Sequence, residues 1–147
     1  MNGGTRVLVL NGPNLGRLGR RQPEIYGTTT YVELVGLCES WGASLGLAVE
    51  VRQTNHEGEL LDWLNEAADE AVAVVLNAAA WSHYSFALYD ACAQLEAPLV
   101  EVHLSDPASR PEKWRHASVV STHAAVVFAG HGVDSYRLAL EHLAGLY

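Results

Sequence analysis

Residues 6–14 read Arg-Val-Leu-Val-Leu-Asn-Gly-Pro-Asn, a short apolar run that stops at a polar turn. The run from Arg6 to Leu10 is β-branched and apolar without alternating polar side chains, which is typical of a strand buried on both faces. The following Asn-Gly-Pro-Asn has the composition of a turn. This stretch therefore predicts a first, buried strand that ends in a loop.

Outward from this stretch, the chain alternates short apolar strands with amphipathic helices. Further strands are predicted over residues 48–52, 73–76, 98–104 and 124–129, and helices over 30–45, 60–67, 83–95 and 133–146. Thr30 and Glu33 have the spacing of a capping box, and Gly46 is a typical helix stop. Five strands alternating with helices indicate an α/β fold, a doubly wound parallel sheet with helices on both faces. At 147 residues we expect one domain, residues 1–147, with flavodoxin-like strand order.

Composition excludes several classes of protein. The net charge of −8 argues against nucleic-acid binding. No run approaches the roughly 20 apolar residues of a membrane span, and the first residues lack the apolar stretch of a secretory signal, so we expect a cytoplasmic protein. Cys38 and Cys92 stand in apolar surroundings without zinc-ligand spacing, which predicts buried free thiols and no metal site.

Polar side chains follow the predicted strands where each one ends. They are Asn11 and Asn14 after the first strand, Asn77 after the third, and His103 and Ser105 after the fourth. In doubly wound sheets ligands bind beyond the carboxyl ends of the strands. The pattern predicts where a site lies, but it does not specify the reaction.

The segment over residues 12–27 is long for a connection between a strand and a helix, and such loops are often mobile lids over active sites. It contains Arg21 and Tyr26. A nearby guanidinium lowers the pKa of a tyrosine by roughly 1–3 units, which makes it a general base near neutral pH. The alternative interpretation is a tyrosine packed on the surface beside solvated arginines.

His103 stands two residues after Glu101, so the two side chains share one face of the strand. The carboxylate would orient the imidazole and favour its charged form, as a general acid requires. The alternative is a buried structural histidine. His83 opens a predicted helix, whose free N–H groups suit a carboxylate ligand, although Ser82 would equally serve as its cap.

Other chemistries lack their motifs. Lys113 is the only lysine and lies in a polar segment, which argues against an imine mechanism. The segment Gly130-His131-Gly132 lacks the third glycine of a dinucleotide-binding loop and follows the last strand. Two basic clusters, one at Arg17, Arg20 and Arg21 and one over residues 110–115, suit either a small anion or a solvated face.

Four segments together resemble the type II 3-dehydroquinate dehydratases. They are Leu10-Asn-Gly-Pro-Asn through Tyr26-Gly27, Arg52-Gln-Thr-Asn-His through Trp63, Leu76-Asn-Ala-Ala-Ala-Trp-Ser-His83, and Glu101-Val-His-Leu-Ser105. The resemblance covers about residues 7–143. It implies a flavodoxin-like homododecamer, a tetramer of trimers. It also implies a cofactor-free anti elimination through an enolate that converts 3-dehydroquinate to 3-dehydroshikimate, in the shikimate pathway or in quinate breakdown.

The resemblance also implies roles for individual residues. Tyr26 would take a proton from C2, Arg21 would favour its phenolate, Asn14 would position a water that stabilises the enolate, and His103 would protonate the departing C1 hydroxyl. The implied substrate contacts are Asn77, His83, Leu104 through its backbone, Ser105 and Arg115, with Asp90 reaching a neighbouring subunit's site.

The sequence departs from the family pattern after His103. Asp106 replaces the usual asparagine, and the segment over residues 107–114 is one residue longer, so Arg110 rivals Arg115 as the substrate ligand. Trp81 and Tyr84 are bulkier than is common beside the family's histidine. Two other functions stay open: a related lyase or isomerase acting on another cyclic polyol acid, and a non-catalytic flavodoxin-like module that binds a small anion.

Overall fold

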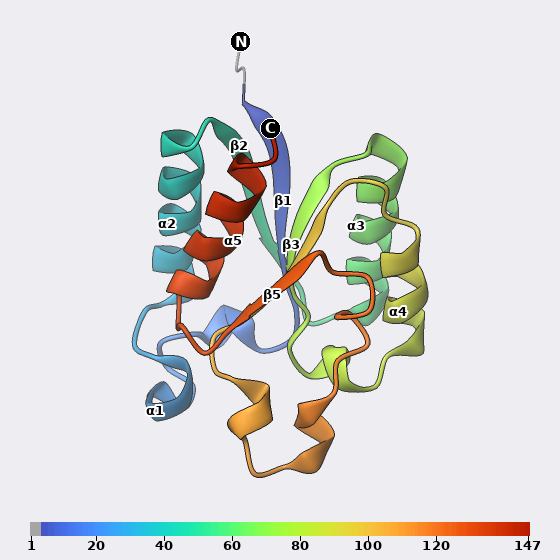
Figure 1. Ribbon diagram of the computed structural model, residues 1–147. Helices are drawn as coiled ribbons and strands as arrows, with labels where there is room; N and C mark the ends of the chain where they lie inside the picture. The colour runs from blue at the N-terminus through green and yellow to red at the C-terminus, as the bar shows by residue number, and fades with distance from the viewer. Residues whose placement is uncertain (1–3) are drawn as a thin grey trace.

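The computed structural model describes residues 4–147, which form a five-stranded sheet between two layers of helices (Figure 1). The strands are β1 (Thr5–Asn11), β2 (Leu47–Gln53), β3 (Ala73–Asn77), β4 (Leu99–His103) and β5 (Val126–Ala129). All neighbouring strands pair in parallel, in the order β2-β1-β3-β4-β5. This is the flavodoxin-like order, so the predicted fold is confirmed.

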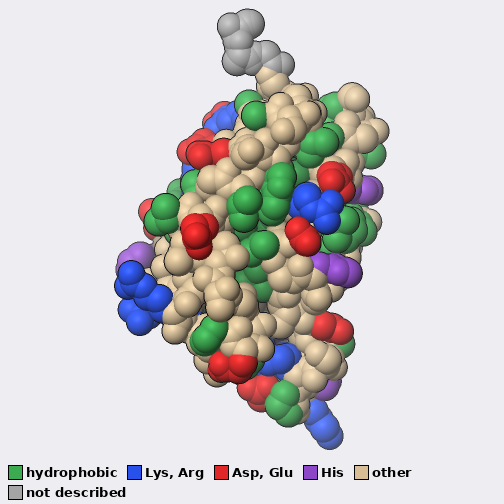
Figure 2. All heavy atoms as spheres, turned by 90° about the vertical axis from the view of Figure 1, so that its left-hand side faces the viewer, with side chains coloured by type: hydrophobic (Ala, Val, Ile, Leu, Met, Phe, Trp, Pro, Cys, Tyr) green, Lys and Arg blue, Asp and Glu red, His purple; other side chains and the backbone are tan. Residues whose placement is uncertain are grey.

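The helices are α1 (Pro23–Tyr26), α2 (Tyr31–Ser44), α3 (Glu57–Glu70), α4 (Phe86–Ala93) and α5 (Asp134–Ala144). Four short 3-10 turns, η1 to η4, lie at Leu15–Arg17, Ala79–His83, Pro107–Ser109 and Lys113–His116. In Figure 1, α2 and α5 cover one face of the sheet and α3 and α4 cover the other. Figure 2 shows the α2 and α5 side, where hydrophobic side chains reach the surface among charged ones.

Strand β1 shows why the sheet is buried on both faces. Its four central side chains have no exposed surface. Val7 and Val9 pack into the core beneath α2 and α5, whereas Leu8 and Leu10 pack into the core beneath α3 and α4. Because successive strand residues point to opposite faces, a strand between two cores needs a continuous apolar run.

Each core also contains one of the two cysteines. Cys38 packs beneath α2 and α5, and Cys92 packs beneath α3 and α4, as the sequence predicts. Burial raises the pKa of both thiols to about 12, so they stay protonated and act as small apolar groups.

The start of α4 corrects one prediction. Residues 79–83 form the separate turn η2, and α4 begins at Phe86 rather than at His83. The cap is Ser85, whose Oγ accepts a hydrogen bond from the Leu88 N–H at 3.0 Å, so Ser82 is not the cap. Within this turn, Trp81 is almost fully buried in the core beneath α3 and α4. By contrast, α2 begins with the predicted capping box of Thr30 and Glu33.

A buried polar chain joins the carboxyl ends of β1 and β3 to α5. The Tyr136 hydroxyl donates to Asn11 Oδ1 at 2.6 Å and accepts from Asn77 Nδ2 at 2.9 Å. Asn77 Oδ1 in turn accepts from the Ala79 N–H at 3.2 Å. With its partners satisfied, this network is stable in the interior and fixes the Asn77 amide in one orientation.

Among residues 4–147, no helix combines the length and the apolar character that crossing a membrane requires.

Candidate active site

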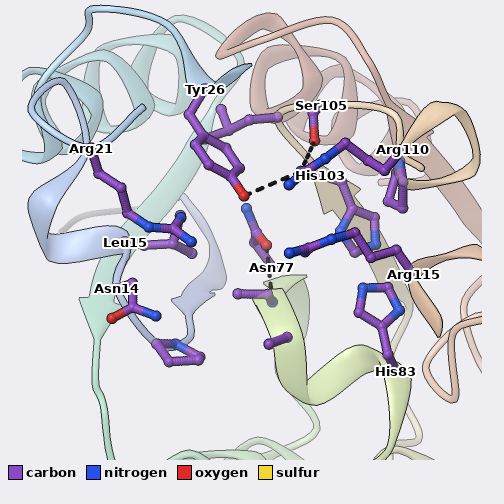
Figure 3. A pocket seen from close by; sticks show the side chains of 15 residues that line it. Asn14, Leu15, Arg21, Tyr26, Asn77, His83, His103, Ser105, Arg110 and Arg115 are labelled. Atoms are coloured by element: carbon purple, nitrogen blue, oxygen red, sulfur yellow. Dashed lines mark hydrogen bonds between the residues drawn. The ribbon is translucent and has the colours of Figure 1, made fainter. Parts of the chain in front are cut away.

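A cleft lies beyond the carboxyl ends of β1, β3 and β4, at the lower end of the sheet in Figure 1. It encloses about 590 Å³, a volume that includes the open solvent at its mouth. Nine of the ten site residues expected from the sequence line it: Asn14, Arg21, Tyr26, Asn77, His83, His103, Leu104, Ser105 and Arg115. Figure 3 shows most of these side chains facing a common centre.

Asp90, the tenth expected residue, lies elsewhere. It is exposed on α4, outside the set of residues that line the cleft of its own chain.

The loop over residues 12–27 brings three of these side chains to the cleft. Two buried leucines, Leu15 and Leu18, anchor it in the core beneath α2 and α5. At its start Asn14 has φ of 71°, a conformation that asparagine tolerates well, and its N–H donates to Asn55 Oδ1 at 2.9 Å. The Asn14 side chain lies at one edge of the cleft (Figure 3). At the far end of the loop, α1 carries Tyr26.

Two guanidinium groups surround Tyr26, which is half-buried. Arg110 Nη1 donates to the Tyr26 hydroxyl at 3.2 Å, and Arg21 lies over the ring with Cζ 4.6 Å from its centroid. Burial raises the pKa of Tyr26, but the hydrogen bond from Arg110 and the positive charges of Arg21 and Arg110 outweigh it, so the pKa lies below its ordinary value. The phenolate is therefore more accessible near neutral pH than that of an exposed tyrosine.

Across the cleft, His103 and Glu101 form a buried pair at the end of β4. His103 Nε2 lies 2.5 Å from Glu101 Oε2, which confirms that the two side chains share a face of the strand. Burial raises the pKa of Glu101, but hydrogen bonds from His103, Ser118 and Ser121 lower it by more. The pKa therefore lies below its ordinary value, and the carboxyl stays ionised. Because Nε2 is held by the carboxylate, Nδ1 is the nitrogen that can exchange a proton with a molecule in the cleft.

His83 presents a neutral imidazole beside this pair. Burial lowers the pKa of His83, and the positive charge of Arg115 acts in the same direction. Its Nδ1 lies 2.7 Å from the Ala117 carbonyl oxygen, which only accepts, so Nδ1 is the protonated nitrogen and Nε2 can accept. The ring packs edge-on against Trp114 with centroids 5.5 Å apart. Trp114 thus fixes the orientation of His83.

Arg110 and Arg115 both line the cleft, so the choice that the sequence left open is not exclusive. Arg110 bonds the Tyr26 hydroxyl and lies 3.3 Å from Ser105 Oγ. Arg115 stacks on Trp114 with Cζ 4.1 Å from the ring centroid and points into the middle of the cleft (Figure 3). Sequence reasoning missed the contact between Arg110 and Tyr26, because no spacing rule connects residues 84 positions apart.

This arrangement can perform a proton abstraction coupled to the loss of a leaving group. Tyr26, whose pKa is lowered beside two cations, can act as a base, and His103, bonded to Glu101, can act as a proton donor. The guanidinium groups suit an anionic substrate. Within the described part of the chain, no three His, Cys, Asp or Glu side chains are grouped to hold a metal ion.

Comparisons with known proteins agree on one family. The profile of the family described as dehydroquinase class II matches residues 5–144. A protein from Salinispora tropica named 3-dehydroquinate dehydratase is 67% identical over 95% of this chain and 96% of its own length. Crystal structures of type II dehydroquinases from Propionibacterium acnes and Butyrivibrio crossotus superpose with TM-scores of 0.94 and 0.92. The first is 54% identical to this chain, and the alignment covers 97% of both chains. The second is 37% identical, and the alignment covers 95% of this chain and 97% of the other.

Proposed function

The chain belongs to the class II dehydroquinase family, and from this premise we propose that it dehydrates 3-dehydroquinate to 3-dehydroshikimate in the cytoplasm, as a step of the shikimate pathway. One observation carries the proposal. Tyr26, held between Arg21 and Arg110, lines the same cleft as His103, which is paired with Glu101. A base and an acid at one small site are what an elimination of water requires.

In the first step, Tyr26 as phenolate removes the proton from C2, next to the C3 ketone. The electron pair of the broken C–H bond moves into the ketone, which becomes an enolate. A water positioned by Asn14 donates a hydrogen bond to the enolate oxygen, because that oxygen carries the developing charge. Arg21 and Arg110 favour the phenolate form of Tyr26 before the transfer. After the transfer, Tyr26 carries the proton and is neutral.

In the second step, His103 transfers a proton to the C1 hydroxyl on the opposite face of the ring. The C1–O bond breaks, water leaves, and the enolate electrons form the C1–C2 double bond of the conjugated enone. The proton gained by Tyr26 balances the proton lost by His103, so solvent only has to exchange them between turnovers. The ionised Glu101 stabilises the imidazolium before it donates.

The remaining cleft residues hold the substrate. Asn77, whose amide is fixed by Tyr136, the neutral His83, Ser105 and the backbone at Leu104 offer hydrogen bonds to its hydroxyls and carboxylate. Arg115 contributes positive charge in the middle of the cleft. We further propose a homododecamer, a tetramer of trimers, in which Asp90 of one subunit reaches the site of its neighbour.

The direct test is ultraviolet absorbance of the purified protein mixed with 3-dehydroquinate after chelator treatment. We expect rapid growth of the conjugated enone, unchanged by chelator or borohydride, because the proposed route uses neither a metal nor an imine. A Tyr26→Phe preparation made in the same way controls for a host enzyme carried through purification. Tight binding without turnover would support the anion-binding module, and turnover of another cyclic acid would support the related lyase.

Replacing either of the two arginines on the 107–116 segment is expected to change a different kinetic parameter. In Arg110→Gln, Tyr26 loses a donor, so its pKa rises and the acid limb of kcat/KM against pH moves to higher pH. At pH values below that limb we expect kcat/KM to be about 10- to 100-fold lower than in the parent, the usual effect of losing a hydrogen bond to a charged group. Arg115→Gln should raise KM and leave the limb in place, because Arg115 does not contribute to the pKa shift of Tyr26. An unmoved limb in Arg110→Gln would contradict its role beside Tyr26.

A further inference from the structure

The Glu101 carboxylate receives three donors, and two of them come from outside its own strand. Its Oε2 accepts from His103 Nε2 at 2.5 Å and from Ser118 Oγ at 2.6 Å, and its Oε1 accepts from Ser121 Oγ at 2.6 Å. Glu101 is 1% exposed, so these groups replace the water that an ionised carboxylate needs. Ser118 and Ser121 belong to the irregular segment between η4 and β5.

The direction of the Ser118 hydrogen bond is fixed by its surroundings. Ser118 Oγ accepts from the Val120 N–H at 3.1 Å, and its own proton is therefore available for Glu101. The Val120 side chain is fully buried beneath α3 and α4, and the Val119 N–H donates to the Ser82 carbonyl at 2.7 Å. Val119 and Val120, which lie between the two serines, anchor this turn to the rest of the protein, so the donors are in place before any substrate binds.

Without these hydroxyls the pair would behave differently. Burial alone raises the pKa of Glu101, and the serine bonds are part of what reverses that effect. If the carboxylate lost two of its three donors, it would become more basic and draw the shared proton away from His103. It would also be free to rotate, because His103 alone fixes only one of its oxygens.

We propose that Ser118 and Ser121 are positioning residues that keep Glu101 ionised and in one orientation, so that His103 presents its proton to the departing hydroxyl. This inference rests on the proposed dehydration, in which His103 is the acid. Neither serine lines the substrate cleft; both line a second hollow that Glu101 also lines. They act through Glu101 and do not touch the substrate.

Other titratable groups surround the pair and must stay constant in the test. Asp106 follows β4, and Cys92 lies on α4 close enough for Glu101 to raise the pKa of its thiol. His83 from η2 stacks with His103 at 6.4 Å between ring centroids. From η4, Arg115 and His116 line the same hollow. None of them is altered by substituting the serines.

The experiment compares Ser118→Ala, Ser121→Ala and the double variant with the parent enzyme. We expect kcat to fall about 10-fold in each single variant and about 100-fold in the double variant, the usual size for lost bonds to a charged group. KM should stay within about two-fold, because the cleft is untouched. The alkaline limb of kcat against pH should move to higher pH, because a more basic carboxylate holds the pair's proton more tightly. Ser118→Thr, which keeps a hydroxyl, should restore most of the activity.

Two controls separate positioning from a general effect on folding. Ser44→Ala removes an exposed hydroxyl bonded to Ser40 at the end of α2 and should change nothing. In a Glu101→Gln background, Ser118→Ala should cost little more, because the charge it supports is already gone. Additive losses in that cycle would overturn the inference, and so would a fall in kcat with an unmoved alkaline limb.

The inference and the proposed function fail in distinguishable ways. A folded double variant with parental kcat and pH profile, beside an active parent, would overturn the role of the serines alone. A parent that binds 3-dehydroquinate without dehydrating it would overturn the proposed function and this inference with it. If the double variant does not fold, the single variants and the cycle with Glu101→Gln decide the question.

Discussion

Replacing Tyr26 by phenylalanine is expected to lower kcat by about 10²- to 10⁴-fold, the usual contribution of a general base. The substitution removes only the hydroxyl, and the ring keeps its half-buried place under Arg21. Binding of substrate or product, measured by calorimetry, should therefore stay close to the parent value. Turnover is followed by the growth of enone absorbance.

The matched control is Tyr147→Phe, because Tyr147 is an exposed tyrosine outside the cleft. Turnover of Tyr26→Phe near the parental rate would remove Tyr26 from the role of base. The remaining activity of a true base variant should also lose the acid limb of its pH profile, since that limb reports the titration of Tyr26. A low but unchanged profile would indicate that the hydroxyl only positions the substrate.

Replacing His103 by alanine is expected to cost a similar factor, about 10²- to 10⁴-fold in kcat. The two variants differ in what survives. With Tyr26 intact, the His103→Ala enzyme should still remove and return the C2 proton, so exchange of that hydrogen in deuterated water should continue without product formation. Tyr26→Phe should lose both the exchange and the product.

His131→Ala is a suitable control, because His131 is exposed and lies outside the cleft. Unimpaired product formation in His103→Ala would refute the acid role. Loss of C2 exchange together with product would indicate that His103 acts on the enolate or on binding. Nuclear magnetic resonance of the substrate in deuterated water measures the exchange directly.

Much of the fold could be predicted because it depends on short-range patterns. The apolar run in β1 requires burial on both faces, and the Thr30 and Glu33 spacing specifies the start of α2. The start of α4 could not be predicted this way. Two serines three residues apart both suit a cap, yet Ser82 is buried inside η2 and Ser85 caps α4, a difference that only the tertiary structure shows.

The site shows the same division. Strand ends and the long loop were enough to bring Asn77, His103 and Tyr26 to one expected edge of the sheet. The partners that set their charges come from irregular segments, such as Arg110 beside Tyr26 and Ser118 beside Glu101. Those contacts depend on how two loops fold over the sheet, and no periodicity in the sequence encodes that.

The bond from Tyr136 to Asn11 spans 125 positions of the chain, and the bond to Asn77 spans 59. During synthesis the sheet strands that carry both asparagines emerge well before α5 does. Until α5 docks, the two amides lack their shared hydroxyl, and the side chain of Asn77, which lines the cleft, keeps only its contact with the Ala79 N–H. The cleft is therefore among the last parts of the molecule to be completed, and a chain still being translated through α4 carries a sheet without a substrate-binding site.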